Sequence, residues 1–188
     1  MNLLRKLSWA DLVTLGSIAL VVVAFRLLFT GDRARSIGVM ALAIVGDYAD
    51  GVVARRYGAS PYGKLLDSFF DEFEYLLFPA AYLLGATDLA VAYLPVVFVM
   101  VGCGLLRLAR FTAEGFSDES ARHYMGMPVF YLGFVPVFLY FGVPAQIVSG
   151  LVLVASGLMI SDIPFAKPRG VVIPAAVLAV AGWFLAWA

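Results

Sequence analysis

The chain has 188 residues, of which 63% are hydrophobic and 14% are charged, and its 13 basic and 13 acidic residues leave no formal net charge. The apolar fraction exceeds the roughly 45–50% that is typical of soluble domains, and the mean hydropathy is +0.95. This composition excludes a water-soluble core and a basic surface for nucleic acid, and the single cysteine, Cys103, excludes an intrachain disulfide.

Long apolar runs divide the chain into segments near the roughly 20 residues that a helix needs to cross a bilayer. We therefore predict an all-α fold, a polytopic transmembrane helical bundle of six to eight spans that forms one domain over residues 1–188. A short interfacial segment that includes Leu3, Leu4, Leu7 and Trp9 precedes the first span. The best count is seven spans, at 11–30, 36–56, 63–86, 89–112, 126–142, 144–162 and 170–187.

The basic residues orient these spans. With the N-terminus in the cytoplasm, ten basic residues fall inside and three fall at or near the outside, as the positive-inside rule requires. This bias predicts an integral protein of the cell membrane. The inside set is Arg5, Lys6, Arg55, Arg56, Lys64, Arg107, Arg110, Arg122, Lys167 and Arg169, and the outside set is Arg26, Arg33 and Arg35.

Carboxylates and small residues share one helical face on each of the second and third predicted spans, at the cytoplasmic end. The short link Tyr57–Tyr62 makes these helices antiparallel neighbours, so the two faces converge. On each helix the spacing of three and four residues keeps the group on one side. The two sets are Asp47, Asp50, Gly51 and Ala54 on the second span, and Gly63, Asp67 and Asp71 on the third.

Four carboxylates without a nearby histidine or cysteine suit hard ions such as Mg²⁺, Mn²⁺ or Ca²⁺. Two such ions neutralise a phosphate and stabilise attacking and leaving oxygens. Gly51 and Ala54 would let a nucleotide or pyrophosphate lie close to the helix backbone. Arg55 and Lys64 stand at the rim, where they suit phosphate.

Three other interpretations of the same acids stay open on the residues alone. The acids could form salt bridges without metal, or the protein could be a non-catalytic membrane scaffold. They could also line the pathway of a divalent-cation transporter, although transport sites usually lie near mid-membrane and transport explains neither Gly51 nor Gly63. The available salt-bridge partners are Arg55, Arg56, Lys64, Arg107 and Arg110.

The fourth predicted span carries Arg107 and Arg110 at its cytoplasmic end, three residues apart and facing the same way. They could bind the carboxylate of a substrate or a lipid phosphate, or they could be structural arginines that snorkel to the interface. His123, the only histidine, falls in a polar loop and is interpreted as a solvated residue.

The stretch from Gly46 to Asp71 resembles the full signature of the CDP-alcohol phosphotransferase (phosphatidyltransferase) family. Its order is Asp47-x-x-Asp50-Gly51-x-x-Ala54-Arg55, seven residues, then Gly63-x-x-x-Asp67-x-x-x-Asp71. The resemblance implies that the four aspartates hold two Mg²⁺ or Mn²⁺ ions and that Asp71 is the general base. The implied CDP-binding residues are Asp50, Gly51, Ala54, Arg55, Gly63, Lys64 and Asp67.

The resemblance also implies an activity in phospholipid biosynthesis. The hydroxyl of a small alcohol would attack the lipid-side phosphorus of CDP-diacylglycerol or CDP-archaeol, and CMP would leave. Family members are commonly homodimers with a site open to the cytoplasm, so the implied partners are the CDP-lipid, the alcohol, membrane lipids and a second copy.

Three further segments resemble membrane-integral phosphatidylserine synthases, archaeal members most closely, and make L-serine the best candidate acceptor. They are residues 103–111, 126–128 and 158–163. Glu74 departs from these enzymes, which have a serine there. At i+7 from Asp67 it could contact an acceptor's ammonium or hydroxyls, or disfavour a carboxylate. Glycerol phosphate, inositol and inositol phosphate therefore stay open as acceptors, with Arg107, Arg110 and Glu74 as the candidate acceptor or phosphate residues.

Overall fold

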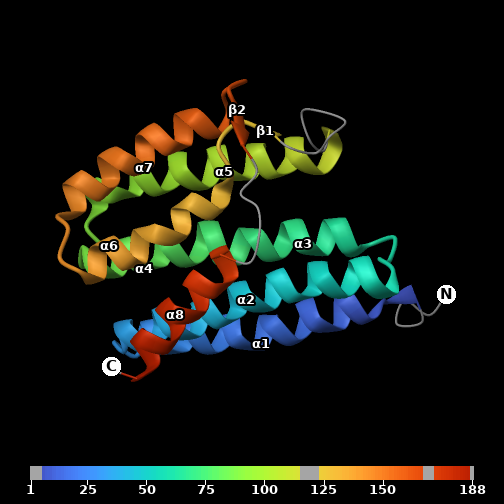
Figure 1. The fold of residues 1–188 in the computed structure, drawn as a ribbon. Coiled ribbons are helices and arrows are strands. Elements are labelled where there is room, and N and C mark those ends of the chain that lie inside the picture. The colour runs from blue at the N-terminus through green and yellow to red at the C-terminus, as the bar shows by residue number, and fades with distance from the viewer. Residues whose placement is uncertain (1–5, 115–122, 167–171, 187–188) are drawn as a thin grey trace. The chain divides into compact units, whose positions relative to one another are not determined.

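The computed structural model describes residues 6–114, 123–166 and 172–186 (Figure 1). Helices make up most of this part, and the prediction of an all-α fold is confirmed. The chain divides into two compact units, residues 1–70 with 169–188 and residues 71–168, which are described separately. Of the predicted interfacial segment, Leu3 and Leu4 lie outside the described residues, and Trp9 is the first residue of the first helix.

The first unit is built from an antiparallel helix pair, α1 (Trp9–Phe29) and α2 (Arg33–Tyr57). Ser8 and Asp11 form a capping box at the start of α1: the Ser8 backbone N–H donates to Asp11 Oδ2 at 2.6 Å, and the Asp11 N–H donates to Ser8 Oγ at 3.3 Å. Asp32 caps α2 by accepting a hydrogen bond from the Arg35 backbone N–H. Most of α3 (Gly63–Asp71) and α8 (Val172–Ala186) complete this unit, and α8 packs on α2.

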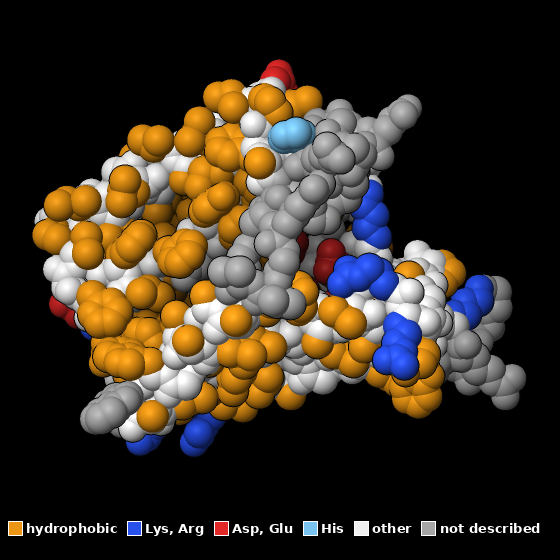
Figure 2. All heavy atoms as spheres, in the orientation of Figure 1, with side chains coloured by type: hydrophobic (Ala, Val, Ile, Leu, Met, Phe, Trp, Pro, Cys, Tyr) orange, Lys and Arg blue, Asp and Glu red, His pale blue; other side chains and the backbone are white. Residues whose placement is uncertain are grey.

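The α1–α2 pair has the character of a membrane-spanning hairpin. Both helices are long and apolar enough to cross a bilayer, and so is the segment Val91–Glu114 in the second unit. Along α1 and α2, hydrophobic side chains cover the length between the basic side chains at the two ends (Figure 2). Several large apolar side chains are exposed, as expected of a lipid-facing surface; among them are Val22, Phe29, Phe98 and Val154.

The second unit surrounds α5 (Leu94–Glu114), which packs against α7 (Ala145–Met159). Its core includes the fully buried Leu76, Tyr82, Met100 and Met159. A small antiparallel sheet pairs His123 with Ala166 and Met125 with Pro164. The remaining elements are the π-helical turn Glu72–Leu77, α4 (Phe78–Ala86), the 3₁₀ turns Val91–Tyr93 and Val129–Phe134, α6 (Val135–Tyr140), β1 (His123–Met125) and β2 (Pro164–Ala166).

The third predicted span, 63–86, is not one regular helix. A π-helical turn, Glu72–Leu77, separates α3 from α4, and the Phe78 N–H donates to the carbonyl of Phe73, five residues back. Pro79 gives the physical reason. Its ring lacks an N–H and clashes with the carbonyl of the residue four positions earlier, here Tyr75, so the helix widens just before it.

The fifth predicted span, 126–142, also differs from the expectation. Pro128 is extended, a 3₁₀ turn follows at Val129–Phe134, and only then does the short α6 begin, with Pro136 near its start. Both prolines account for the late start, because a proline is tolerated only in the first turn of an α-helix. The helices in this part and in the last two predicted spans are shorter than 18 residues, so the count of seven spans stays a prediction.

Candidate active site

Three of the four predicted carboxylates converge in the first unit. Asp47 and Asp50 lie on α2, Asp67 lies on α3, and each offers an oxygen within 4.8 Å of the others. Asp50 is buried, while Asp47 and Asp67 are half-buried. The carboxylates converge because Asp47 and Asp50, three residues apart on α2, project toward the face of α3 that carries Asp67.

The donor set fits a hard divalent cation. The side chains of Asp47 and Asp67 lie within hydrogen-bonding reach of one another, although both are carboxylates that repel when ionised. Neither Asp50 nor Asp67 forms an ion pair with any described residue, which disfavours the metal-free salt-bridge interpretation for these two. Oxygen donors of this kind at this separation match the ligand preference of Mg²⁺ or Mn²⁺.

A threonine on the neighbouring helix holds one of these carboxylates. The Thr14 hydroxyl on α1 donates to Asp50 Oδ2, and both side chains are buried. Thr14 is not among the predicted site residues. The available signal was a polar stripe in an apolar span: Asp11, Thr14 and Ser17 recur every three residues on α1, and all three are buried.

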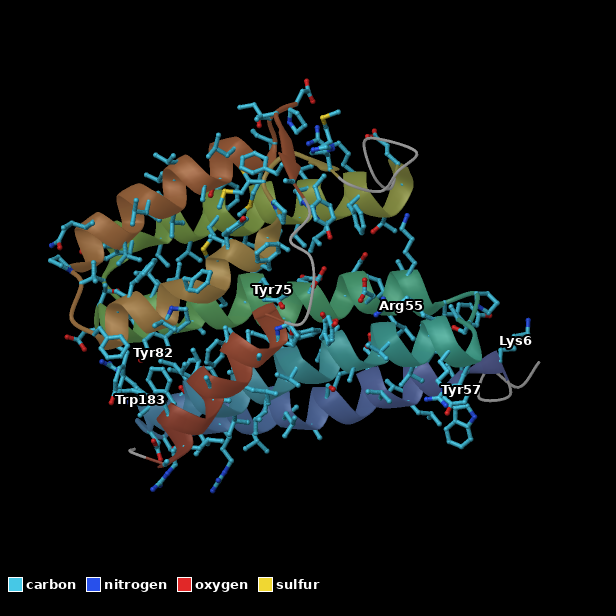
Figure 3. The ribbon with its side chains drawn as sticks, viewed as in Figure 1. Lys6, Arg55, Tyr57, Tyr75, Tyr82 and Trp183 are labelled. Carbon is cyan, nitrogen blue, oxygen red and sulfur yellow. The ribbon has the colours of Figure 1, made fainter. Side chains whose placement is uncertain are left out.

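The predicted nucleotide-binding glycines have neighbours at ordinary contact distance and no tight packing around them. A side chain added at Gly51 would meet only Arg55 Nη1, at 3.5 Å, and one added at Gly63 would meet Asp11 Oδ1 first, at 3.6 Å. Ala54 is half-buried, and Arg55 and Lys64 are exposed. Figure 3 shows Arg55 at the same end of the first unit as Lys6 and Tyr57. This end therefore combines a carboxylate cluster with cationic side chains at its rim.

The fourth carboxylate, Asp71, is the last residue of α3, one helical turn after Asp67. It is also the first residue of the second unit. Its part in the carboxylate cluster is therefore a prediction of the helical spacing. Within the second unit, Asp71 interacts electrostatically with Arg107 of α5.

Arg107 and Arg110 have different surroundings, although they are one turn apart on α5. The Arg107 guanidinium is buried beside a pair of contacting rings, 5.1 Å from the Phe111 centroid and 5.2 Å from that of Tyr124, and the two centroids lie 5.6 Å apart. Its Nε makes no hydrogen bond to any described residue. Arg107 therefore keeps hydrogen-bonding capacity for an anionic group.

Arg110 instead connects three segments of the second unit. Its guanidinium donates to Asp162 Oδ1 at 3.0 Å and to the carbonyl oxygens of Ser161 at 2.9 Å and Met125 at 3.1 Å. Gly126 makes this possible: its φ is +73°, and a side chain there would overlap Arg110 and the Met159 carbonyl. These contacts favour the structural interpretation of Arg110.

Glu74 lies in the π-helical turn and is buried, with 1% of its surface exposed. The expectation that it shares the face of Asp67 assumed 3.6 residues per turn throughout. That assumption is wrong here, because the π-helical turn changes the angular spacing between residues 72 and 77. A role for Glu74 toward an acceptor stays a prediction.

Comparison with known proteins identifies the family of the chain. A model of the CDP-alcohol phosphatidyltransferase family matches residues 7–187. The chain belongs to this family. No protein of curated function matches it.

Family membership gives the general activity. This CDP-alcohol phosphatidyltransferase is a membrane transferase of phospholipid biosynthesis that acts on CDP-alcohol and lipid substrates. Enzymes of the family typically depend on a divalent metal, and the aspartate cluster agrees with that requirement. Membership of a transferase family favours group transfer over the ion-transport and scaffold alternatives.

Proposed function

We propose that this enzyme transfers a phosphatidyl-type group from a CDP-lipid to L-serine, with two Mg²⁺ or Mn²⁺ ions held by Asp47, Asp50, Asp67 and Asp71. The observation that carries the proposal is the convergence of three of these carboxylates within 4.8 Å. A divalent cation bound there would neutralise the phosphate oxygens and stabilise CMP as the leaving group. Either CDP-diacylglycerol or CDP-archaeol would serve as the lipid donor.

The CDP group would bind along α2 and the start of α3. The small residues Gly51, Ala54 and Gly63 would let it approach the helix backbone, and the exposed Arg55 and Lys64 would contact its phosphates. Asp50 and Asp67 would border the same site. These residues would hold the donor with the lipid-side phosphorus facing the acceptor.

Asp71 would accept the proton of the attacking hydroxyl. A serine hydroxyl is a weak nucleophile at neutral pH and needs a positioned base. Asp71 follows Asp67 by one turn of α3, at the end of the helix that supports the cluster. Asp71 also interacts electrostatically with Arg107, the candidate residue for binding the acceptor.

Arg107 supports serine over a phosphorylated acceptor. One guanidinium can bind a carboxylate through two hydrogen bonds, whereas a phosphate of higher charge would call for more basic side chains. Arg110 is already engaged by Asp162 and three backbone carbonyls, which leaves Arg107 as the arginine of this pair with hydrogen-bonding capacity. Glycerol phosphate, inositol and inositol phosphate are the alternatives.

An acceptor panel tests the proposal. Purified full-length protein would receive CDP-diacylglycerol or CDP-archaeol, Mg²⁺ or Mn²⁺, and one of serine, glycerol phosphate, inositol or inositol phosphate. We expect CMP release that depends on metal and is fastest with serine. CMP release with glycerol phosphate but not with serine would overturn the assignment of serine as the acceptor. CMP release that persists with a chelator would overturn the proposed metal requirement.

We further propose that residues 1–188 act as one domain in a homodimer in the cell membrane, with the N-terminus and active site in the cytoplasm. The support is the family resemblance and the bias of basic residues toward one side of the membrane. Light scattering of the detergent-solubilised protein is expected to give twice the chain mass of 20.3 kDa after subtraction of the detergent. A monomeric mass would contradict the dimer.

A further inference from the structure

We propose that Thr14 is a positioning residue for this site, whose hydroxyl fixes the Asp50 carboxylate in the orientation that binds the cation. The inference rests on the proposed function, because it assigns Asp50 to metal binding. Thr14 lies outside the family signature that spans residues 47–71, on a different helix. It contributes nothing to the charge of the site and acts through Asp50 alone.

The contact is local and enclosed. The Thr14 hydroxyl donates to Asp50 Oδ2, and Thr14 Oγ1 also lies 3.2 Å from the carbonyl oxygen of Ala10 on its own helix. Thr14 has 5% of its surface exposed and Asp50 has 6%, so water has little access to replace the bond. A carboxylate has two oxygens that rotate about one bond; occupying Oδ2 leaves Oδ1 to face a cation.

A close helix contact one turn away sets this geometry. A side-chain carbon at Gly46 of α2 would overlap Ser17 Oγ of α1 and lie 3.0 Å from Ser17 Cβ. Because the helices are antiparallel, Thr14 precedes Ser17 by about one turn and Asp50 follows Gly46 by about one turn. The Gly46–Ser17 contact therefore brings the backbones close enough for the short threonine side chain to reach the carboxylate.

Such support has a measurable consequence. Groups that hydrogen-bond to a ligating carboxylate orient it before the metal arrives, and their loss typically weakens metal affinity or activity about 10- to 100-fold. Without Thr14, Asp50 would rotate among several orientations and bind the cation less tightly. Serine would replace threonine well, because it supplies the same hydroxyl, whereas valine keeps the shape and removes the donor.

The test measures Mn²⁺ affinity of the purified full-length protein without nucleotide, by the electron paramagnetic resonance signal of free Mn²⁺. We expect Thr14→Val to weaken Mn²⁺ binding about 10-fold and Thr14→Ser to stay within about twofold of wild type. Thr30→Val is the matched control: it makes the same change at the C-cap of α1, at the opposite end of the helix, where the hydroxyl bonds to the Arg26 and Leu27 carbonyls. Its Mn²⁺ affinity should equal that of wild type.

Turnover separates positioning from a general loss of structure. CMP release by Thr14→Val should recover as Mn²⁺ is raised, since added metal compensates for weak binding but does not refold a damaged protein. Gly46→Ala should weaken Mn²⁺ binding as Thr14→Val does, and adding Ser17→Gly to it should restore affinity by returning the lost space. Wild-type Mn²⁺ affinity in Thr14→Val would overturn the inference.

The outcomes distinguish the inference from the proposed function. If the wild type binds Mn²⁺ but releases no CMP with any acceptor, the reaction is wrong while the Mn²⁺ comparison still decides the role of Thr14. If the wild type binds no Mn²⁺, both are overturned. If Thr14→Ser loses affinity as severely as Thr14→Val, the hydroxyl is not what matters and the inference fails.

Discussion

Several buried polar side chains inside the helices have a definite partner. The Thr14 hydroxyl holds Asp50, and Asp11 caps α1 through Ser8. Arg110 donates to backbone carbonyls, whereas Arg107 packs beside the rings of Phe111 and Tyr124 and keeps an unbonded Nε. Placing a polar group in an apolar helix is unfavourable, so these partners show which residues stabilise the fold and which stay available for ligands.

Asp71→Asn tests the assigned base. The amide cannot accept the proton of the acceptor hydroxyl, so turnover should fall at least about 100-fold, while Asp47, Asp50 and Asp67 still bind Mn²⁺. CMP release and Mn²⁺ titration measure the two effects. Asp88→Asn is the control, because it makes the same change at an exposed turn where φ is +50°, a conformation that asparagine tolerates. Near-normal turnover in Asp71→Asn would contradict the role.

Arg107→Met tests the acceptor assignment. Removing a charged hydrogen-bond donor to the serine carboxylate should raise KM for serine about 10- to 100-fold, with a smaller change in KM for the CDP-lipid. Arg107→Lys should restore little of the affinity for serine, since an ammonium cannot form the paired hydrogen bonds of a planar guanidinium to a carboxylate and stacks less well on the aromatic rings. Steady-state CMP release at varied serine measures both. An unchanged KM for serine would place the acceptor elsewhere.

At the scale of the element, prolines and glycines decide where the regular helices end. Pro79 widens the helix into the π-helical turn Glu72–Leu77, and Pro136 delays the start of α6. Gly126 lets the chain turn between β1 and the 3₁₀ segment while it lies against the end of α7. The elements near the candidate acceptor residues are thus the irregular ones.

Gly126→Ala tests the close approach on which that arrangement depends. A left-handed backbone alone costs a non-glycine residue about 1–3 kcal/mol, and the added carbon would also overlap the Met159 carbonyl oxygen and Arg110. We expect the melting temperature to fall by several degrees. Gly157→Ala, in α7 with open space around it, should leave the melting temperature equal or raised. Equal stability of Gly126→Ala would contradict the argument.

At the scale of the whole molecule, the sequence predicts features that follow from a periodic pattern. Apolar run length located α1 and α2 to within three residues, and the spacing of Asp47, Asp50 and Asp67 placed them on facing helices. The π-helical turn was not predicted, because the helical periodicity used for the prediction assumes 3.6 residues per turn throughout. The widening that Pro79 causes lies before the proline and leaves no mark in that periodicity. The polar stripe on α1 signals that Thr14 is buried but does not give its partner, because the register of α1 against α2 depends on a contact between residues 17 and 46 that no local pattern contains.

Cysteine accessibility tests the predicted orientation of the α1–α2 hairpin. Because the two helices are antiparallel, the exposed residue Thr30 lies at one end and the exposed residue Ala59 follows α2 at the other. In a Cys103→Ala background, a membrane-impermeant maleimide should label Thr30→Cys in intact cells and label Ala59→Cys only after lysis. The reverse pattern would put the carboxylate cluster outside the cell, away from nucleotide. It would contradict the positive-inside assignment, in which Lys6, Arg55, Arg56 and Lys64 hold their end in the cytoplasm.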